Sequence, residues 1–379
     1  MKKYIYADNA ATTAIDENVL QSMQQYLRNE YGNASQPYSF GRTAKKAIND
    51  SRSVIASCIG AKAEEIFFTS CGTESDNWVI KNSFPYSSII TSCIEHHAIL
   101  NACKAVSNNT EVVKLTVDRS GLVSLRDLDE ALRNTVDDSR VLVSIMTANN
   151  EIGTIQPIKQ LAEISHSHGA IFHTDAVQAV GHIKINVDEM GVDMLSASAH
   201  KFNGPKGIGF LYVRKGTAIS PFIDGGLQEN GMRAGTENVA SIVGMATALK
   251  NNTNMLEASS KYIYELETRL IQRLEASDVE YIRNGSINHI PGNISISFKN
   301  GDGEMILHRM DLKGICISTG SACDSVRTQI SHVIKSISVD PDYANGTIRI
   351  SLGKNNTFEE VDTIAKELIG IVHSSCSHK

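Results

Sequence analysis

Lys201 lies at a position where the amine of a lysine can become reactive. It follows the apolar stretch of residues 194–199, stands beside His200, and precedes a turn at Gly204 and Pro205. A lysine just past the end of a buried strand is partly desolvated, which lowers its pKa toward the neutral amine that forms a Schiff base with a carbonyl. Taken alone, the pattern fits an ordinary surface lysine in a loop equally well.

An acidic residue ends a second apolar stretch. Residues 170–173 lead into Thr174 and Asp175, and Gln178 follows shortly after. Pyridoxal 5'-phosphate (PLP) requires such an acid beside a Schiff-base lysine, because the carboxylate keeps the pyridine nitrogen protonated and the ring then accepts electrons. Each residue also has a simpler explanation, since Asp175 could cap the next helix and Gln178 could be solvated.

A helix start follows a third apolar stretch, in Thr69-Ser-Cys-Gly-Thr-Glu-Ser75. Its backbone N–H groups and the hydroxyl of Thr73 could hold a phosphate. The alternative is a simple capped helix start. His96 comes at the end of another strand and could stack on an aromatic cofactor, although paired histidines are more often surface or capping residues.

The elements that must position these residues follow from the apolar pattern. Continuous apolar strands separated by helices predict an α/β fold with a mostly parallel sheet that is buried on both faces. Helical patterns occur around residues 19–27 and over residues 158–168. The predicted strands cover residues 65–69, 88–91, 141–145, 170–173, 194–196 and 208–213.

The pattern changes after about residue 238. A long helix is expected to about residue 275, then alternating strands at 293–298 and 347–352, and a last helix over about 357–373. Alternation predicts strands with one solvated face, and therefore a smaller α+β domain. We expect residues 16–250 to form a large PLP-binding domain, and residues 1–15 and 251–379 to form the small domain.

Composition narrows the classes of function. The 379 residues carry a formal net charge of −6, which argues against a nucleic-acid or membrane-surface partner. No apolar run is long enough to span a bilayer, and Asp8 and Asn9 interrupt the apolar run that a signal peptide needs. The seven cysteines form no CxxC pair, which predicts a cytoplasmic protein with reduced thiols and neither a disulfide framework nor a metal site.

Together these motifs resemble the PLP-dependent cysteine desulfurases of aminotransferase class V. The resemblance covers nearly the whole chain, and its strength lies in the number of motifs that occur in one order. It implies the type I PLP fold and a homodimer with active sites at the subunit interface. The motifs are Tyr6-Ala-Asp-Asn-Ala-Ala-Thr-Thr13, Tyr31-Gly-Asn33, Cys71-Gly-Thr-Glu-Ser-Asp-Asn77, Ala148-Asn-Asn-Glu-Ile-Gly153, Gly231-Met-Arg-Ala-Gly-Thr236, Ser318-Thr-Gly-Ser-Ala-Cys323 and Thr347-Ile-Arg-Ile-Ser-Leu-Gly353.

The resemblance also assigns roles to individual residues. It implies that Lys201 bonds covalently to PLP, that Asp175 pairs with the pyridine nitrogen, and that Gln178 bonds the ring hydroxyl. His96 would stack on the ring and move protons. The phosphate would be held by Gly72, Thr73, Ser198, His200 and, from the neighbouring subunit, Thr236. The cofactor and the substrate carboxylate would be contacted by Asn150, Arg349 and Asn33.

The resemblance makes L-cysteine the substrate and Cys323 the nucleophile. The Cys323 thiolate would take the sulfur atom as a persulfide, leaving alanine. A sulfur-acceptor protein or carrier would receive it, for iron–sulfur cluster assembly or another thio-modification. The alternative for a lone cysteine is a buried structural residue. Asp324, beside the thiol, departs from the family pattern and disfavours the thiolate.

Other functions stay open at this point. A selenocysteine lyase or an aminotransferase would use the same cofactor, but an aminotransferase has no use for Cys323 and a strict selenocysteine lyase would turn over little cysteine. A third possibility is an inactive dimer that binds a partner. The joint presence of Lys201, Asp175, His96 and Cys323 argues against this third possibility.

Overall fold

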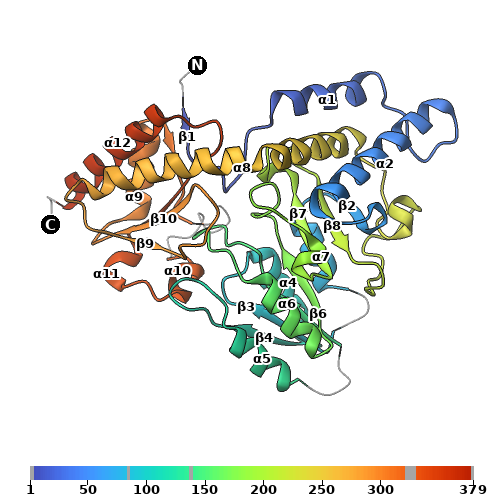
Figure 1. The fold of residues 1–379 in the computed structure, drawn as a ribbon, viewed down its shortest axis with the longest axis horizontal. Helices are drawn as coiled ribbons and strands as arrows, with labels where there is room; N and C mark the ends of the chain where they lie inside the picture. Colours follow the sequence, from blue (N-terminus) through green and yellow to red (C-terminus); the bar gives the residue numbers. More distant parts are fainter. Residues whose placement is uncertain (1–3, 83–85, 136–139, 321–329, 377–379) are drawn as a thin grey trace.

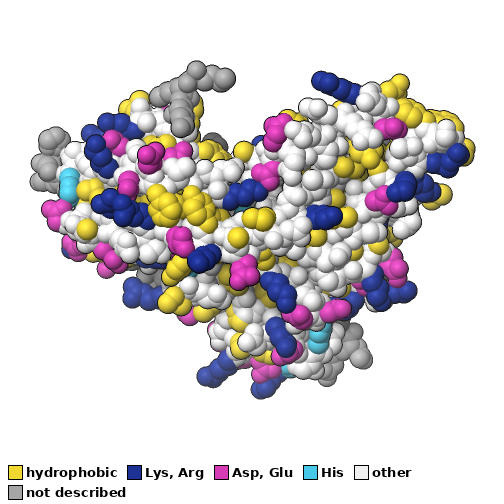
Figure 2. Space-filling model, turned by 45° about the horizontal axis from the view of Figure 1, so that its top comes forward, with side chains coloured by type: hydrophobic (Ala, Val, Ile, Leu, Met, Phe, Trp, Pro, Cys, Tyr) yellow, Lys and Arg dark blue, Asp and Glu magenta, His cyan; other side chains and the backbone are white. Residues whose placement is uncertain are grey.

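The computed structural model describes residues 4–82, 86–135, 140–320 and 330–376. Within them, Figure 1 shows a large sheet with helices on both faces, a smaller sheet at the other end of the molecule, and one long helix running past both. Lys, Arg, Asp and Glu side chains are interspersed on the face that Figure 2 draws.

The large sheet has seven strands among the described residues. The pairs from β7 through β6, β5 and β3 to β4 are parallel, whereas β8 runs antiparallel to both of its neighbours. This confirms the predicted mostly parallel sheet. In spatial order the strands are β2 (Ile66–Thr69), β8 (Gly209–Val213), β7 (Met194–Ser198), β6 (Ile171–Asp175), β5 (Val141–Ser144), β3 (Ser88–Ser92) and β4 (Glu111–Leu115).

Alternate side chains of this sheet enter two separate cores. Val143 and Leu195 pack in the core that also holds helices α1, α2, α5 and α6, while Leu142 and Met194 pack in the core with α3 and α4. Such two-sided burial explains the continuous apolar runs. The helices are α1 (Glu17–Arg28), α2 (Ser39–Ile59), α3 (Gly72–Ile80), α4 (His97–Val106), α5 (Leu125–Arg133), α6 (Ile158–Ser167) and α7 (Val187–Met190).

Helix α8 (Val239–Glu275) joins the two halves of the molecule. Its first half packs Met245 and Leu249 in the core of the large sheet, and its second half packs Leu266 and Leu270 in a different core. None of the described helices, α8 included, combines the length and the apolar composition that crossing a membrane requires. The domain boundaries near residues 15 and 250 stay a prediction.

The second core belongs to a three-stranded antiparallel sheet in the described part of the chain, with β10 at its centre. A short parallel pair, β1 with β11, lies beside it. The elements of this half are β1 (Ile5–Tyr6), β9 (Tyr281–Asn284), β10 (Asn293–Phe298), α9 (Gly303–Leu312), β11 (Ile315–Cys316), α10 (His332–Ser336), α11 (Pro341–Ala344), β12 (Thr347–Ser351) and α12 (Phe358–Cys376).

The predicted solvated face of β10 and β12 is wrong, because every residue of both strands is buried. Their polar side chains find hydrogen-bond partners within the protein instead. The hydroxyl of Ser297 lies 2.6 Å from that of Thr347 and accepts from the amide of Asn284 at 2.8 Å. Hydroxyl pairs of this kind remove the cost of burying alternate polar residues.

Candidate active site

A cavity of about 230 Å³ opens at the carboxyl ends of β6 and β7. The crevice outside the carboxyl ends of parallel strands is where α/β sheets most often bind ligands. Most of the predicted site residues line this cavity, namely Gly72, Thr73, His96, Asn150, Asp175, Gln178, Ser198, His200, Lys201 and Arg349.

Lys201 ends a short 3₁₀ turn that directly follows β7. Its Nζ atom donates hydrogen bonds to the carbonyl oxygens of Ala10 and Ala11, at 2.7 and 2.8 Å. Both alanines line the cavity with it. The amine is therefore held at the cavity wall by the N-terminal part of the chain.

Asp175 is the last residue of β6 and is 5% exposed. Burial raises the pKa of its carboxyl group to about 6, although the N–H of Val177 and the charge of Lys201 act in the other direction. The N–H of Val177 donates to its Oδ1 atom at 2.9 Å. A carboxylate kept in this environment is well suited to a cationic ring nitrogen as its partner.

Asp76, on α3, lines the same cavity and is 1% exposed. Burial and the neighbouring Asp175 raise the pKa of its carboxyl group well above its ordinary value. His173 lies 3.9 Å from it, but burial lowers the pKa of that imidazole to about 3. The imidazole is therefore neutral, and the pair is no salt bridge.

The other end of the cavity offers donors for an anion. Gly72 and Thr73 are the first residues of α3, where backbone N–H groups have no partner within the helix. A Cβ atom at Gly72 would lie 2.5 Å from Cγ2 of Val177, so only glycine fits there without a shift. The hydroxyl of Ser198 is buried and has no hydrogen-bond partner among the described residues, as expected for a ligand-binding group.

Three more cavity residues have fixed orientations. His96 is the N-cap of α4, and its Nδ1 atom accepts from the N–H of Ala98 at 3.1 Å. Gln178 donates to the carbonyl oxygen of Ala10 at 2.9 Å. The Nδ1 atom of His200 lies 3.1 Å from the hydroxyl oxygen of Thr12. The pKa of His200 is lowered to about 4, mainly by burial, with Lys201 and Lys206 adding to the effect. His96 is thus both a helix cap and a cavity residue.

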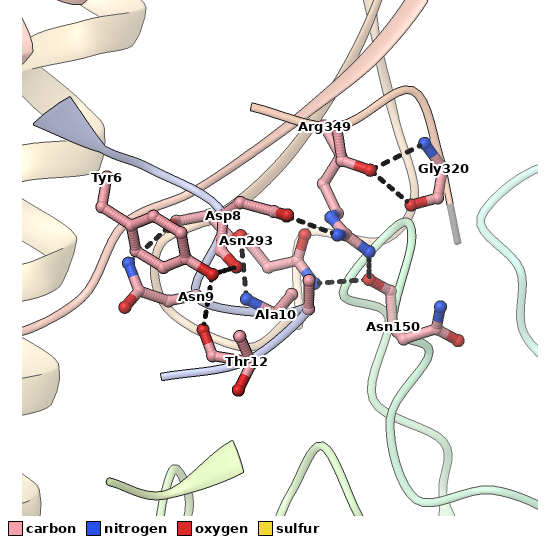
Figure 3. Close-up of polar contacts among 12 residues, drawn as sticks. Tyr6, Asp8, Asn9, Ala10, Thr12, Asn150, Asn293, Gly320 and Arg349 are labelled. Carbon is pink, nitrogen blue, oxygen red and sulfur yellow. Dashed lines mark hydrogen bonds and ion pairs between the residues drawn. The ribbon is translucent and has the colours of Figure 1, made fainter. Parts of the chain in front are cut away.

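Arg349 reaches the cavity from β12 and is 2% exposed. Figure 3 shows its guanidinium between Asp8 and the backbone of Asn150. The Nη2 atom lies 2.6 Å from Oδ1 of Asp8, and Nη1 donates to the carbonyl oxygen of Asn150 at 2.8 Å. A buried guanidinium that also faces a cavity is a natural site for a carboxylate ligand.

Three predicted residues are not among those lining the cavity. Thr236 is exposed on the loop before α8, and Asn33 is exposed with its Oδ1 atom accepting from the N–H of Ser35 at 2.9 Å. Cys323 and its neighbour Asp324 lie outside the described residues. The roles predicted for these residues stay predictions.

The sequence reasoning missed the part of the N-terminal segment that reaches the site. The motif that contains Asp8, Ala10 and Ala11 is part of the family resemblance, which implies no role for these three residues. Backbone carbonyls carry no signal in side-chain identity, so Ala10 and Ala11 could not have been found. Asp8 and Asp76 were visible as carboxylates within recognised motifs, and only the fold shows what they face.

The donor set fits PLP. It provides an amine at a strand end, a buried carboxyl group for the pyridine nitrogen, and an anion cradle at a helix start with an unpartnered buried hydroxyl. A single protein chain that offers these three groups around one cavity matches the three chemically distinct parts of the cofactor, its aldehyde, its ring nitrogen and its phosphate.

A model of the class-V aminotransferase family matches residues 5–364, and the chain belongs to this family. Its members use PLP. The chain is 47% identical over 370 residues to cysteine desulfurase IscS from Dictyoglomus turgidum, covering 96% of this chain and 93% of that protein.

Two solved structures are also similar over most of their length. A NifS-like protein superposes with a TM-score of 0.91 at 38% identity, covering 98% of this chain and 100% of that chain. SspA in complex with cysteine superposes with a TM-score of 0.81 at 33% identity, covering 93% and 100%. These likenesses confirm the predicted fold class and family.

Replacing Asp175 with Asn should stabilise the cofactor-free protein while weakening PLP binding. The folded-state pKa of about 6 exceeds the ordinary 3.8, so the folded chain holds this proton more tightly. The cost of the buried charge therefore grows as the pH rises from about 4 to 6 and is fully present above that range. Thermal unfolding should show a gain for Asp175→Asn at pH 8 that disappears near pH 4.

The same melts with added PLP test the second half of this prediction. PLP should raise the melting temperature of the wild type more than that of Asp175→Asn, since binding to the folded state stabilises in proportion to affinity. An equal gain at both pH values, or an equal response to PLP, would contradict the role given to Asp175.

Proposed function

We infer that the protein is a cysteine desulfurase, which uses PLP to remove the sulfur atom of L-cysteine and release L-alanine. The observation that carries this proposal is the placement of Lys201, Asp175 and Arg349 around one cavity. The names of the relatives at 42–47% identity, which are cysteine desulfurases, support it over an aminotransferase.

The large half of the chain binds the cofactor. The start of α3 and the hydroxyl of Ser198 would hold the phosphate, Asp175 would pair with the ring nitrogen, and Lys201 would make the covalent attachment. His96 would stack on the ring and Gln178 would orient it. When bound, PLP serves as an electron sink that weakens bonds at the substrate carbons. Arg349 binds the substrate carboxylate and so orients the cysteine sulfur.

Lys201 also has a role in proton transfer. The carbonyl oxygens of Ala10 and Ala11 accept hydrogen bonds from Nζ and hold this amine at the wall of the cavity. From there Lys201 and His96 take up and return protons. Held groups of this kind need no reorganisation during the reaction.

Cys323 takes the sulfur atom. Its thiolate attacks the sulfur of bound cysteine, so a sulfur–sulfur bond forms while the carbon–sulfur bond of the substrate breaks. The electron pair of the broken bond stays with the carbon fragment, which gains a proton and leaves as alanine. The persulfide on Cys323 then passes its outer sulfur to a protein or carrier in the cytoplasm, where a reducing environment keeps the thiol free.

We propose that the enzyme works as a homodimer in which Thr236 completes the phosphate site of the partner subunit. Thr236 is exposed, and Leu227 on the same loop has 89% of its side chain exposed. A large apolar side chain this exposed on a loop that also carries a site residue favours a covered surface in the assembly.

Sedimentation of the holoenzyme tests the dimer. We expect a mass near twice that of one chain, and a shift toward the monomer in Leu227→Asp, because burying a charge in an apolar contact is costly. Ile287→Asp, at another exposed apolar side chain (99% exposed), serves as the matched control. A wild-type monomer that turns over cysteine at full rate would refute the shared site.

Lys201 should be the residue that binds PLP covalently. The purified protein should absorb in the visible range, and borohydride should fix the cofactor to the peptide that contains Lys201. Lys206, only five residues further along the chain, provides the internal comparison. An adduct mapped by mass spectrometry to Lys206, or one that survives in Lys201→Ala, would show that the assignment is wrong.

Cys323→Ser should retain the bound cofactor and still bind L-cysteine, but lose sulfide release by at least about a hundredfold. A hydroxyl matches the thiol in size but ionises far above neutral pH and does not accept a sulfur atom. Alanine and sulfide formed from L-cysteine with a reductant are the measured products.

Cys71→Ser is the control, because Cys71 is a second thiol at the cavity. This variant should keep most of the activity. Loss of sulfide release in Cys71→Ser, with Cys323→Ser unaffected, would move the persulfide to Cys71. Activity in both variants would indicate a lyase that expels sulfur directly.

A further inference from the structure

Asp8 forms the ion pair that holds Arg349. The two side chains belong to different parts of the chain, the N-terminal segment after β1 and strand β12, and their atoms approach to 2.6 Å. The guanidinium lines the cavity, whereas Asp8 does not. Asp8 therefore contacts Arg349 from outside the cavity and leaves the cavity side of the guanidinium for a ligand.

The backbone on both sides of this pair is fixed. The N–H of Arg349 donates to the carbonyl oxygen of Ser318 at 2.6 Å, and the N–H of Ser318 donates back at 3.0 Å. On the other side, the hydroxyl of Tyr6 donates to the carbonyl oxygens of Asp8 and Thr12 at 3.0 and 2.8 Å. Burial raises the pKa of Tyr6 to about 12, so this hydroxyl remains a donor.

The orientation of the guanidinium then depends on few contacts. Nη1 is held by the carbonyl oxygen of Asn150 and Nη2 by Asp8, while the buried Nε atom has no hydrogen-bond partner among the described residues. Without Asp8, one backbone carbonyl would be the remaining fixed acceptor for this side chain. An arginine that must meet a carboxylate in a planar, two-bond geometry cannot tolerate such freedom without losing affinity.

We propose that Asp8 is a positioning residue that aims Arg349 at the carboxylate of the substrate and thereby makes the enzyme select α-amino acids over simple amines. The proposal rests on the function proposed above, in which Arg349 binds that carboxylate. Asp8 touches neither substrate nor cofactor, and acts only through the guanidinium it holds.

Two small ligands isolate this role. L-alanine carries the carboxylate and ethylamine is the same molecule without it, and neither has a sulfur atom to transfer. Each is titrated into the holoenzyme and followed by the absorbance of the bound cofactor. The ratio of the two dissociation constants measures how much the carboxylate contributes, whereas a general loosening of the site would weaken both ligands together.

Asp16→Ala is the matched control for Asp8→Ala. Asp16 also lies in the N-terminal segment and pairs with Lys354, just after β12, at 2.7 Å with 19% of its side chain exposed, against 2.6 Å and 18% for Asp8. It tethers the same two regions but does not contact Arg349. Asp8→Ala should lower the preference for L-alanine at least about tenfold, the loss of one oriented charge-assisted hydrogen bond.

Asp8→Asn should keep the preference within about threefold of the wild type, since its amide oxygen still accepts from Nη2, and Asp16→Ala should leave it unchanged. An unchanged or increased preference in Asp8→Ala overturns the proposal, as does an equal loss in Asp16→Ala or in Asp8→Asn. Arg349→Lys tests separately whether Arg349 binds the carboxylate. If this variant keeps the wild-type preference, that part of the proposed function is wrong, whatever the result for Asp8.

Discussion

The turn of residues 8–13 is joined by hydrogen bonds to the segment that carries His200 and Lys201. These bonds connect two distant parts of the chain. Ala10 and Ala11 accept from Lys201, and Thr13 bonds to the backbone around His200 through both its N–H and its hydroxyl. These contacts join residues that are 187 to 191 positions apart in the sequence. The position of the reactive amine therefore depends on the N-terminal segment as much as on the sheet that carries Lys201.

The carboxyl groups that line the cavity destabilise the structure, whereas the hydrogen bonds of the N-terminal turn stabilise it. Asp175 and Asp76 are both buried with raised pKa values, chiefly because burial disfavours their charged forms. Carboxyl groups buried together in this way destabilise the cofactor-free protein, and a cation that binds beside them lowers this cost. Such local destabilisation is typical of sites that are stabilised by their ligand.

How far the sequence predicts the structure differs between the sheet and the site. The strand ends that carry Asp175 and Lys201 could be placed because parallel strands bury both faces and so read as continuous apolar runs. The same reasoning fails for β10 and β12, where alternation predicts a solvated face but every residue is buried. Whether Ser297 faces water or Thr347 depends on what packs over the strand, and that is a tertiary property.

The contacts of the N-terminal turn could not be predicted for a different reason. Loop-to-loop hydrogen bonds to carbonyl oxygens follow from the path of the backbone and leave no pattern in residue types. The ion pair between Asp8 and Arg349 joins oppositely charged residues 341 positions apart, and many other pairings were equally possible from charge alone. Thr236 poses a further difficulty, since its proposed role needs a second subunit.

The N-terminal segment also reaches the strand that leads toward Cys323. Ile5 and Tyr6 pair in parallel with Ile315 and Cys316 of β11, and Ser318, two residues further on, bonds to the backbone of Arg349. One short stretch of chain thus contacts Lys201, Arg349 and strand β11. In the proposed function, Lys201 and Arg349 act on one substrate molecule, which requires a fixed geometry between them. A shared support satisfies that requirement better than two independent loops, because Lys201 and Arg349 are both bonded to the same N-terminal turn.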